Sequence, residues 1–288
     1  MVKHIEKIAL GSVQFGMDYG ISNKNGRTSF AEVSKIIKYA RDMGICTIDT
    51  SSLYGTSETV LGSQNLDRFK LISKFPFVKN NREIKGQLAA SLHNLKLNNI
   101  YGFLAHRPSC LLENSTIWQT LIELKNQNLI KKIGFSVYTP VELMKLIDSG
   151  FFPDLVQLPY NLVDKRFSNL IDELALNNVE IHTRSAYLQG LFFRNPQELP
   201  SYFDPIKEIL SKLHDKFETT GDLAIFLLKH CIDNNNIHNV VIGLNNLQQL
   251  KDTIANYNEN ISSFNLGFDC ADKALLNIIN PANWPKNI

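Results

Sequence analysis

Eight short apolar runs, spaced along the whole chain, are the feature that most constrains how this sequence can fold. Each run is rich in Ile, Val, Leu and Phe and shows little polar alternation, which is typical of strands covered on both faces. Amphipathic stretches of roughly ten to fifteen residues, a length typical of helices, lie between the runs. The predicted strands are residues 7–12, 46–50, 71–75, 102–106, 132–136, 155–158, 180–184 and 239–242.

The amphipathic stretches predict helices that pack their apolar sides against these strands. The first begins after Ser29, whose spacing from Glu32 matches a capping box. Residues 223–231 are apolar nearly all round and predict a buried helix. Residues 188–205 contain several prolines and predict a long loop, and one more helix is expected after Asp269.

Eight strand–helix units within 288 residues predict an α/β fold, a closed (β/α)8 barrel of the TIM type, in a single domain covering residues 1–288. A doubly wound sheet is the main alternative, but it normally has fewer strands and often a glycine-rich first turn. Neither G-x-G-x-x-G nor the P-loop pattern occurs in the sequence. In a barrel, functional residues gather where the strands end and the βα loops begin.

Charge and composition argue against several classes of protein. Thirty Lys and Arg against 28 Asp and Glu give a net charge of +2 with no long basic run, so nucleic acid is not the expected ligand. No apolar stretch approaches the roughly 20 residues of a membrane span, and the first residues lack the apolar core of a signal peptide. The four cysteines lie far apart, which argues against a disulfide framework. A soluble, cytoplasmic, globular protein is expected.

Four titratable residues lie at or just after predicted strand ends. Asp49 is near the end of the second strand, Lys74 near the end of the third, and His106 ends the fourth; Tyr54 follows Asp49 in the next loop. Taken singly, each has an ordinary explanation as a helix cap, a rim charge, a structural histidine or a packing tyrosine. Barrel geometry would bring all four to one mouth, where an acid, an amine, an imidazole and a phenol form a coherent proton-transfer site.

The order of motifs along the chain resembles that of the aldo-keto reductases, (β/α)8 barrels that reduce carbonyl compounds with a nicotinamide cofactor. The resemblance begins at LGSVQFGMDYGI and is most specific in ARDMGICTIDTSSLYGTSETVLG, where the family shows GI-x-x-IDTA-x-x-YG-x-SE-x-x-LG. ISKF, LAHRP, IGFSVY, VQLPYN, RSAYLQGLF and NVVIGLNNLQQLKDTIA follow in family order. The motifs are similar to those of a bacterial subgroup with sugar-type oxidoreductases, which favours a sugar-derived aldehyde or ketone as substrate.

Carried over residue by residue, the resemblance implies a catalytic tetrad in which Asp49, Tyr54, Lys74 and His106 are all present. Tyr54 would donate the proton to the substrate oxygen, and Lys74 beside it would lower the pKa of the phenol. Asp49 would hold and neutralise Lys74, so that no charge is buried unpaired. His106 would bind and orient the substrate oxygen.

The resemblance also implies an extended NADP(H) molecule across the strand ends, with NAD(H) as the alternative. Ser136 and Gln157 match the positions that bind the nicotinamide carboxamide. The full set of residues that match cofactor contacts is Gly11, Ser12, Ser136, Gln157, Arg184, Ser185, Ala186, Leu188, Gly190, Gly243, Asn245, Gln249, Asp252 and Thr253.

Three departures from the family pattern concern the cofactor. Ser136 is followed by Val137 instead of Asn, so one amide contact is missing. Arg184 stands where many members place an aromatic ring against the nicotinamide; a planar guanidinium can stack there or can instead pair with a carboxylate. Residues 243–253 offer only Lys251 as a cation for the 2′-phosphate of NADPH. Weak discrimination between NADPH and NADH is therefore expected.

Three functions remain open: an NAD(P)H-dependent carbonyl reductase, a catalytically silent cofactor-binding barrel acting as a sensor or regulatory subunit, and a barrel enzyme of another class such as an isomerase or aldolase. The complete tetrad favours the first over the second. The cofactor motifs, and histidines without metal-ligand spacing, favour it over the third, and no metal site is expected.

The expected partner is a small carbonyl substrate, bound by a monomer, with a weak dimer as the alternative. Aromatic, basic and flexible side chains near the predicted strand ends and in the tail are candidates for the substrate rim: Met17, Asp18, Tyr19, Arg107, Trp118, Tyr160, Phe192, Phe193, Arg194 and Trp284.

Overall fold

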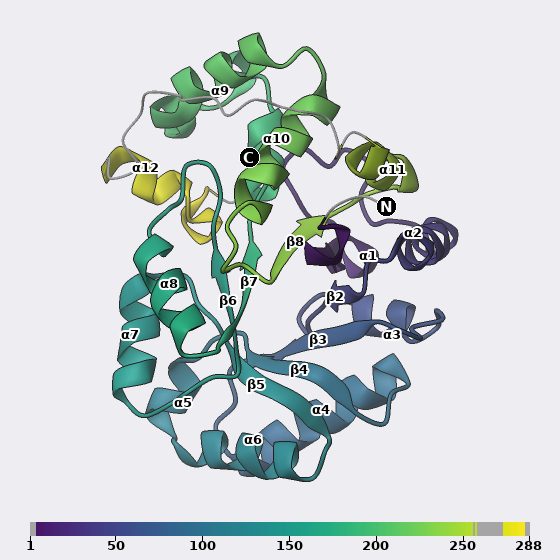
Figure 1. The fold of residues 1–288 in the computed structure, drawn as a ribbon, viewed down its shortest axis with the longest axis vertical. Helices are drawn as coiled ribbons and strands as arrows, with labels where there is room; N and C mark the ends of the chain where they lie inside the picture. Colours follow the sequence, from purple (N-terminus) through teal and green to yellow (C-terminus); the bar gives the residue numbers. More distant parts are fainter. Residues whose placement is uncertain (1–3, 256, 258–272, 286–288) are drawn as a thin grey trace.

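A closed barrel of eight parallel strands forms the centre of the molecule, in a computed structural model that describes residues 4–255, 257 and 273–285 (Figure 1). Each strand pairs with the next along the chain, and β8 pairs with β1. The α/β prediction of a single-domain (β/α)8 barrel is thereby confirmed. The strands are β1 Ile8–Gly11, β2 Thr47–Asp49, β3 Lys70–Phe75, β4 Ile100–Ala105, β5 Ile130–Ser136, β6 Leu155–Pro159, β7 Glu180–Arg184 and β8 Asn239–Gly243.

Helices surround the barrel in the order that the sequence predicts (Figure 1). The α-helices are α1 Val13–Gly16, α2 Phe30–Met43, α3 Ser57–Leu61, α4 Asn81–Leu95, α5 Ser109–Glu113, α6 Thr116–Asn126, α7 Pro140–Asp148, α8 Ser168–Leu176, α9 Asp204–Lys216, α10 Thr220–Ile232, α11 Leu247–Ala255 and α12 Lys273–Ile278. The last of these is the helix expected in the tail; residues 258–272, including Cys270, lie outside the described part. Short 3-10 helices are η1 Ile5–Lys7, η2 Leu188–Phe193, η3 Pro196–Glu198, η4 Ser201–Phe203 and η6 Pro281–Asn283.

The ends of α2 follow from its capping residues. The Ser29 side chain accepts a hydrogen bond from the backbone N–H of Glu32, and Gly44 takes a left-handed conformation, with φ of 91°, after the last turn. The second bond of the expected capping box is replaced: the Glu32 carboxylate accepts the backbone N–H of Leu247 at 2.8 Å. This carboxylate therefore caps the first turn of α11 and ties that helix to α2.

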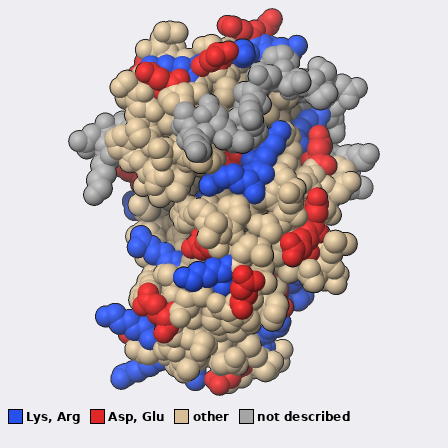
Figure 2. All heavy atoms as spheres, turned by 90° about the vertical axis from the view of Figure 1, so that its left-hand side faces the viewer, with Lys and Arg blue, Asp and Glu red and all other residues tan. Residues whose placement is uncertain are grey.

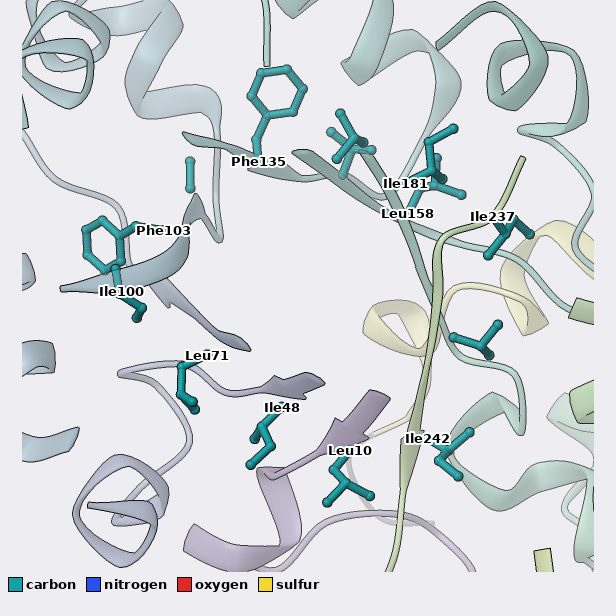
Figure 3. Packing of buried hydrophobic residues seen from close by; sticks show 14 of the residues in the cluster. Leu10, Ile48, Leu71, Ile100, Phe103, Phe135, Leu158, Ile181, Ile237 and Ile242 are labelled. Carbon is teal, nitrogen blue, oxygen red and sulfur yellow. The ribbon is translucent and has the colours of Figure 1, made fainter. Parts of the chain in front are cut away.

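The main hydrophobic core lies between the barrel and its helices. Buried side chains of the strands, such as Leu10, Phe103 and Phe135, point outward from the ring of strands towards the helices (Figure 3). Alternate residues on the same strands point into the barrel, where Ile72, Leu104 and Leu155 form a small separate apolar cluster. The barrel is therefore filled with side chains and does not form a channel.

A second hydrophobic cluster joins η2, η4, α9, α12 and the first half of α10. Residues 188–205 contribute to it, so the prediction of a long loop there is wrong: this stretch forms three short 3-10 helices. Its apolar residues, including Leu191, Leu199 and Phe203, are buried in this cluster, and Pro196 occupies the first turn of η3. The prolines make a regular α-helix unfavourable without preventing compact packing.

The outer surface shown in Figure 2, which carries α7 and α8, has Lys and Arg interspersed with Asp and Glu and no continuous patch of one sign. Within the described residues, no helix combines the length and apolar character that crossing a membrane requires.

Two glycines in contrasting surroundings test the packing of the barrel. A Cβ at Gly134 in β5 would lie 1.7 Å from the carbonyl oxygen of Leu155 on the paired strand β6, whereas a Cβ at Gly86 in α4 meets nothing within 4 Å. We expect Gly134→Ala to lower the free energy of unfolding by about 1–3 kcal/mol or more through overpacking. Gly86→Ala should raise it by roughly 0.5–1 kcal/mol through helix propensity. Urea denaturation measures both, and equal effects would contradict this account of the strand contact.

Candidate active site

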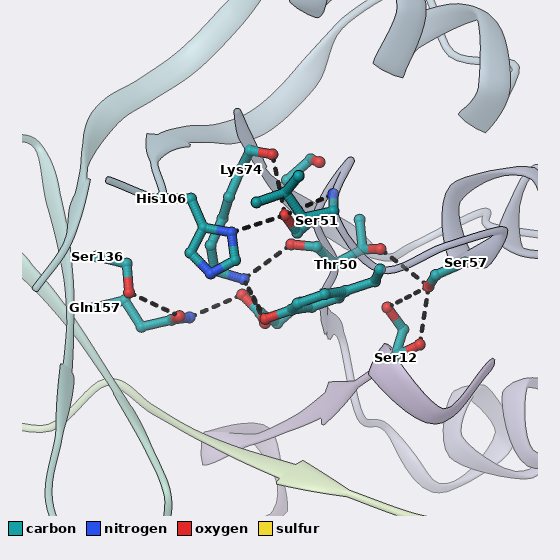
Figure 4. Close-up of polar contacts among 12 residues, drawn as sticks. Ser12, Thr50, Ser51, Ser57, Lys74, His106, Ser136 and Gln157 are labelled. Carbon is teal, nitrogen blue, oxygen red and sulfur yellow. Dashed lines mark hydrogen bonds and ion pairs between the residues drawn. The ribbon is translucent and has the colours of Figure 1, made fainter. Parts of the chain in front are cut away.

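A buried ion pair lies at the carboxyl ends of β2 and β3. The ammonium group of Lys74, whose side chain is fully buried, donates to Asp49 Oδ2 at 2.7 Å and to the backbone carbonyl of Thr50 at 2.8 Å (Figure 4). Burial lowers the pKa of Lys74, while the contact with Asp49 opposes that change. A buried charge is tolerated only when it is paired and hydrogen-bonded, and both conditions are met here.

The other oxygen of Asp49 is held from across the barrel. Gln157 on β6 donates its Nε2 to Asp49 Oδ1 at 2.8 Å, and Ser136 on β5 donates to Gln157 Oε1 at 3.4 Å. Gln157 and Ser136, which the resemblance assigns to the nicotinamide, thus also form a chain that fixes the carboxylate. Ser136 is buried and does not line the cavity described below.

Tyr54 lies directly beside this pair. Its hydroxyl oxygen is 3.5 Å from Lys74 Nζ, which also lies 5.0 Å from the centre of the phenol ring. Burial, followed by the negative charge of Asp49, raises the pKa of Tyr54 well above its usual value, and the positive charge of Arg184 opposes this. The lowered pKa that was expected for this phenol beside Lys74 is therefore not found in the protein alone, because burial disfavours the phenolate. Tyr54 is protonated throughout the neutral range.

His106 follows β4 directly and meets the Tyr54 ring edge to face, with 5.8 Å between ring centres. Its pKa is lowered to about 3, first by burial and then by the positive charges of Lys74, Arg184 and Arg107. The imidazole is therefore neutral at physiological pH and acts there as a hydrogen-bonding group rather than as a cation.

Ser51 is a site residue that the sequence analysis missed. Its hydroxyl lies 3.0 Å from His106 Nδ1. The carbonyl of Lys74, the other acceptor within reach, already receives the backbone N–H and the hydroxyl of Ser52, both at 3.1 Å. We therefore assign the Ser51 proton to Nδ1, which leaves the proton of the neutral ring on Nε2. The signal was present in the sequence, because Ser51 stands where the quoted IDTA pattern has alanine.

A cavity of about 770 Å³ opens above this group. Met17, Tyr19, Arg107 and Phe193 of the proposed rim line it; the other rim candidates do not. Lys74, Ser136 and Leu188 are the predicted site residues outside the lining, the first two below its floor and the third in the second hydrophobic cluster. The predicted residues that line it are Gly11, Ser12, Asp49, Tyr54, His106, Gln157, Arg184, Ser185, Ala186, Gly190, Gly243, Asn245, Gln249, Asp252 and Thr253.

The end of the cavity formed by β1 and β8 has features that suit a polar, extended ligand. Two buried acceptor atoms that line it, Gln14 Oε1 and Asn245 Oδ1, have no hydrogen-bond partner among the described residues. A Cβ at Gly243 would lie 2.6 Å from the Gln14 amide nitrogen, so a larger residue there would displace the Gln14 side chain. Gly190 has φ of 88°, which glycine adopts without strain. The lining therefore presents hydrogen-bonding atoms that have no partner among the described residues.

Two cations proposed for cofactor contacts take definite positions. The guanidinium of Arg184 lies over the Tyr138 ring at 4.3 Å and donates to the carbonyl of Val137 at 3.0 Å, with no carboxylate partner in the described part of the chain. The ammonium of Lys251 lies 5.8 Å from the centre of the Tyr39 ring on α2 and does not line the cavity. Within the described residues, no group of three His, Cys, Asp or Glu side chains could hold a metal ion.

Comparison with known proteins identifies the relatives of this chain. A model described as the Aldo/keto reductase family matches residues 7–265. Uncharacterized oxidoreductases from Mycobacterium bovis and Mycobacterium tuberculosis are 30% identical over 145 residues, which cover 48% of this chain and 44% of theirs. The aligned part therefore spans less than half the length of these relatives.

Solved structures extend the likeness to most of the barrel. An aldo-keto reductase from Bacillus halodurans in its holo form is 18% identical over 89% of this chain and 88% of that one, with a TM-score of 0.71. A glycerol dehydrogenase from Gluconobacter oxydans is 18% identical over 86% of each chain, with a TM-score of 0.67. A putative aldo-keto reductase from Pseudomonas aeruginosa is 24% identical over 87% and 89%, with a TM-score of 0.65. At these identities the likeness establishes the fold.

The two adjacent serines provide a test of the histidine assignment. Ser51→Ala removes the only described partner of His106 Nδ1 and should convert the ring from one tautomer to a mixture. Ser52→Ala is the control, because the Ser52 hydroxyl donates to the Lys74 carbonyl and makes no hydrogen bond with His106. This variant should leave the tautomer of His106 unchanged. The 15N chemical shifts of the imidazole distinguish the tautomers. An unchanged spectrum in Ser51→Ala would show that the hydroxyl does not set the tautomer.

Proposed function

The chain belongs to the aldo/keto reductase family, and from that membership we propose that it is an NAD(P)H-dependent oxidoreductase that reduces an aldehyde or ketone to an alcohol. One observation carries the proposal: a protonated phenol, a buried ammonium–carboxylate pair and a neutral imidazole meet at the floor of one cavity. These are the groups that carbonyl reduction needs for moving one proton to the substrate oxygen.

The cavity lining supports binding of a nicotinamide dinucleotide along the ends of β1, β7 and β8. Gln14 Oε1 and Asn245 Oδ1 are available to accept hydrogen bonds from the hydroxyl and amide groups of this cofactor. When bound, the reduced nicotinamide supplies a hydride to the carbonyl carbon of the substrate. The stacked Arg184 side chain presents a flat surface beside the catalytic group, which supports its proposed place near the nicotinamide ring.

Tyr54 is the proposed proton donor. As the carbonyl carbon is reduced, its oxygen becomes an alkoxide, which is a stronger base than a phenolate and takes the proton from the Tyr54 hydroxyl. The ammonium of Lys74, 3.5 Å away, then stabilises the phenolate until a proton returns from solvent through the cavity. The raised pKa ensures that the phenol holds its proton before the reaction.

His106 is proposed to orient the substrate. A neutral imidazole with its proton on Nε2 donates a hydrogen bond to the carbonyl oxygen and positions it against the Tyr54 hydroxyl. An imidazolium here would add a third positive charge beside Lys74 and Arg184, and their combined effect on the pKa disfavours that form.

The substrate that we propose is a small hydroxylated carbonyl compound of the sugar type. The sequence motifs support it, and so does the fold shared with a glycerol dehydrogenase. A catalytically silent sensor remains the second candidate; it would bind the cofactor but show no turnover with any carbonyl compound. The complete proton-transfer group favours the enzyme.

Tyr54→Phe keeps the ring and deletes the transferable proton. Carbonyl reduction should fall by at least about a hundredfold, the usual contribution of a positioned acid, while affinity for NADPH changes little. Tyr202→Phe is the matched control, because its hydroxyl bonds only backbone carbonyls outside the cavity and its loss should leave turnover unchanged. Steady-state kinetics and fluorescence titration give both quantities. Near-normal turnover in Tyr54→Phe would exclude Tyr54 as the donor.

We further propose that NADPH is preferred over NADH by less than about a hundredfold, because no cation of residues 243–253 lines the cavity and the carboxylate of Asp252 does. A charge-assisted bond to the 2′-phosphate contributes about 1.5–3 kcal/mol, or one to two decades of affinity. Gln249→Arg should therefore raise NADPH affinity selectively. Gln248→Arg, which adds the same charge outside the cavity, should not. A thousandfold NADPH preference in the unaltered protein would mean that another cation reaches the phosphate.

A further inference from the structure

Positive charge is concentrated at the catalytic end of the cavity. The charged side chains in its lining are Asp49, Arg107, Arg184 and Asp252. Asp49 is neutralised by Lys74, and Asp252 lies on α11 beyond β8, where it accepts a hydrogen bond from Gln248 at 2.6 Å. With His106 neutral, the two guanidinium groups are left without a negative counterpart at this end.

Both arginines lack a carboxylate partner within the described part of the chain. Arg184 is held in place by the Val137 carbonyl and the Tyr138 ring, so its charge is fixed but not neutralised. Arg107 follows His106, is exposed, and makes no ion pair with any described residue. Both lie close enough to His106 to lower its pKa. Arg107, Arg184 and His106 line the same cavity, so a substrate bound against His106 meets both positive charges.

The position of Arg107 separates it from the part of the cavity assigned to the cofactor phosphates. That part is built on the loops after β7 and β8, whereas Arg107 follows β4, which lies opposite β8 in the ring of eight strands. An unpaired guanidinium on this side serves the substrate more directly than it serves the cofactor. Its planar fork of donors matches the oxygens of a carboxylate or a phosphate.

We propose that the substrates of this enzyme carry an anionic group, a carboxylate or a phosphate, which Arg107 and Arg184 bind while His106 and Tyr54 engage the carbonyl oxygen. This inference rests on the proposed carbonyl reductase function and names its substrate class. The anionic group undergoes no bond change. Its binding positions the reacting carbonyl against His106 and Tyr54. A cavity lined by one sign of charge also raises the local concentration of such a substrate.

Matched substrate pairs test the proposal. Glyceraldehyde 3-phosphate is compared with glyceraldehyde, and succinic semialdehyde with butanal, so that the two arms distinguish phosphate from carboxylate. We expect kcat/KM to be at least about tenfold higher for the anionic member of one pair, mainly through a lower KM, because a charge-assisted bond contributes about one to two decades. Equal values within both pairs would overturn the proposal and leave the reductase function standing.

Variants of Arg107 test whether the preference for anionic substrates arises in the cavity. Arg107→Gln should reduce the anionic-to-neutral ratio of kcat/KM about tenfold or more, and Arg107→Lys should restore part of it because it keeps the charge without the fork. Arg82→Gln, which removes an equal charge from an exposed position on α4, should leave the ratio unchanged. An unchanged ratio in Arg107→Gln would overturn the role of Arg107.

A protein that reduces none of the four compounds would count against the proposed function, and the anion site is then tested without turnover. The anion site is then measured by titration calorimetry of the protein with succinate and with inorganic phosphate. Binding that is lost in Arg107→Gln and kept in Arg82→Gln would support the site without any turnover. No binding of either anion would refute it.

Discussion

The buried ion pair between Lys74 and Asp49 is the contact on which the rest of the site depends. Removing two charges from water costs several kcal/mol per ion, and the cost is offset only by good geometry and full hydrogen bonding. The barrel provides both, because Thr50 supplies a carbonyl to the ammonium and Gln157 supplies an amide to the carboxylate from the opposite side. Closure of the sheet is therefore a condition for the charge to exist at this position.

Burial of this pair also sets the protonation states around it. The same exclusion of water that raises the pKa of Tyr54 lowers that of His106, since in each case the charged form is disfavoured. The result is a neutral phenol and a neutral imidazole beside a paired cation, which is the arrangement required before a proton is donated. These protonation states match the role of proton donor that we propose for Tyr54.

The sequence predicted the barrel and the strand-end groups because both follow from short-range patterns. Apolar runs report burial, and a residue at a strand end shares one rim with its counterparts. Contacts between distant segments were not predictable in this way: the bond from Gln157 to Asp49 and the stacking of Arg184 on Tyr138 depend on the register of closed strands. The direction of the Tyr54 pKa shift was not predictable for a related reason. The burial of its side chain depends on how all the loops at this end of the barrel pack together.

The strand order of the barrel separates the two ligand preferences that we propose for this cavity. The contacts that we propose for cofactor selection come from α11 and the end of β8, whereas Arg107 comes from the end of β4 on the opposite side of the ring. Residues so far apart share no hydrogen-bond partner in the described structure, and substitutions at such sites combine nearly additively. Arg184, on β7 between these regions, has a place in both proposals: it is assigned to the nicotinamide ring and to the anionic group of the substrate. We therefore expect substitutions that alter the preferred substrate charge to leave cofactor preference unchanged, except at Arg184, where one substitution should alter both.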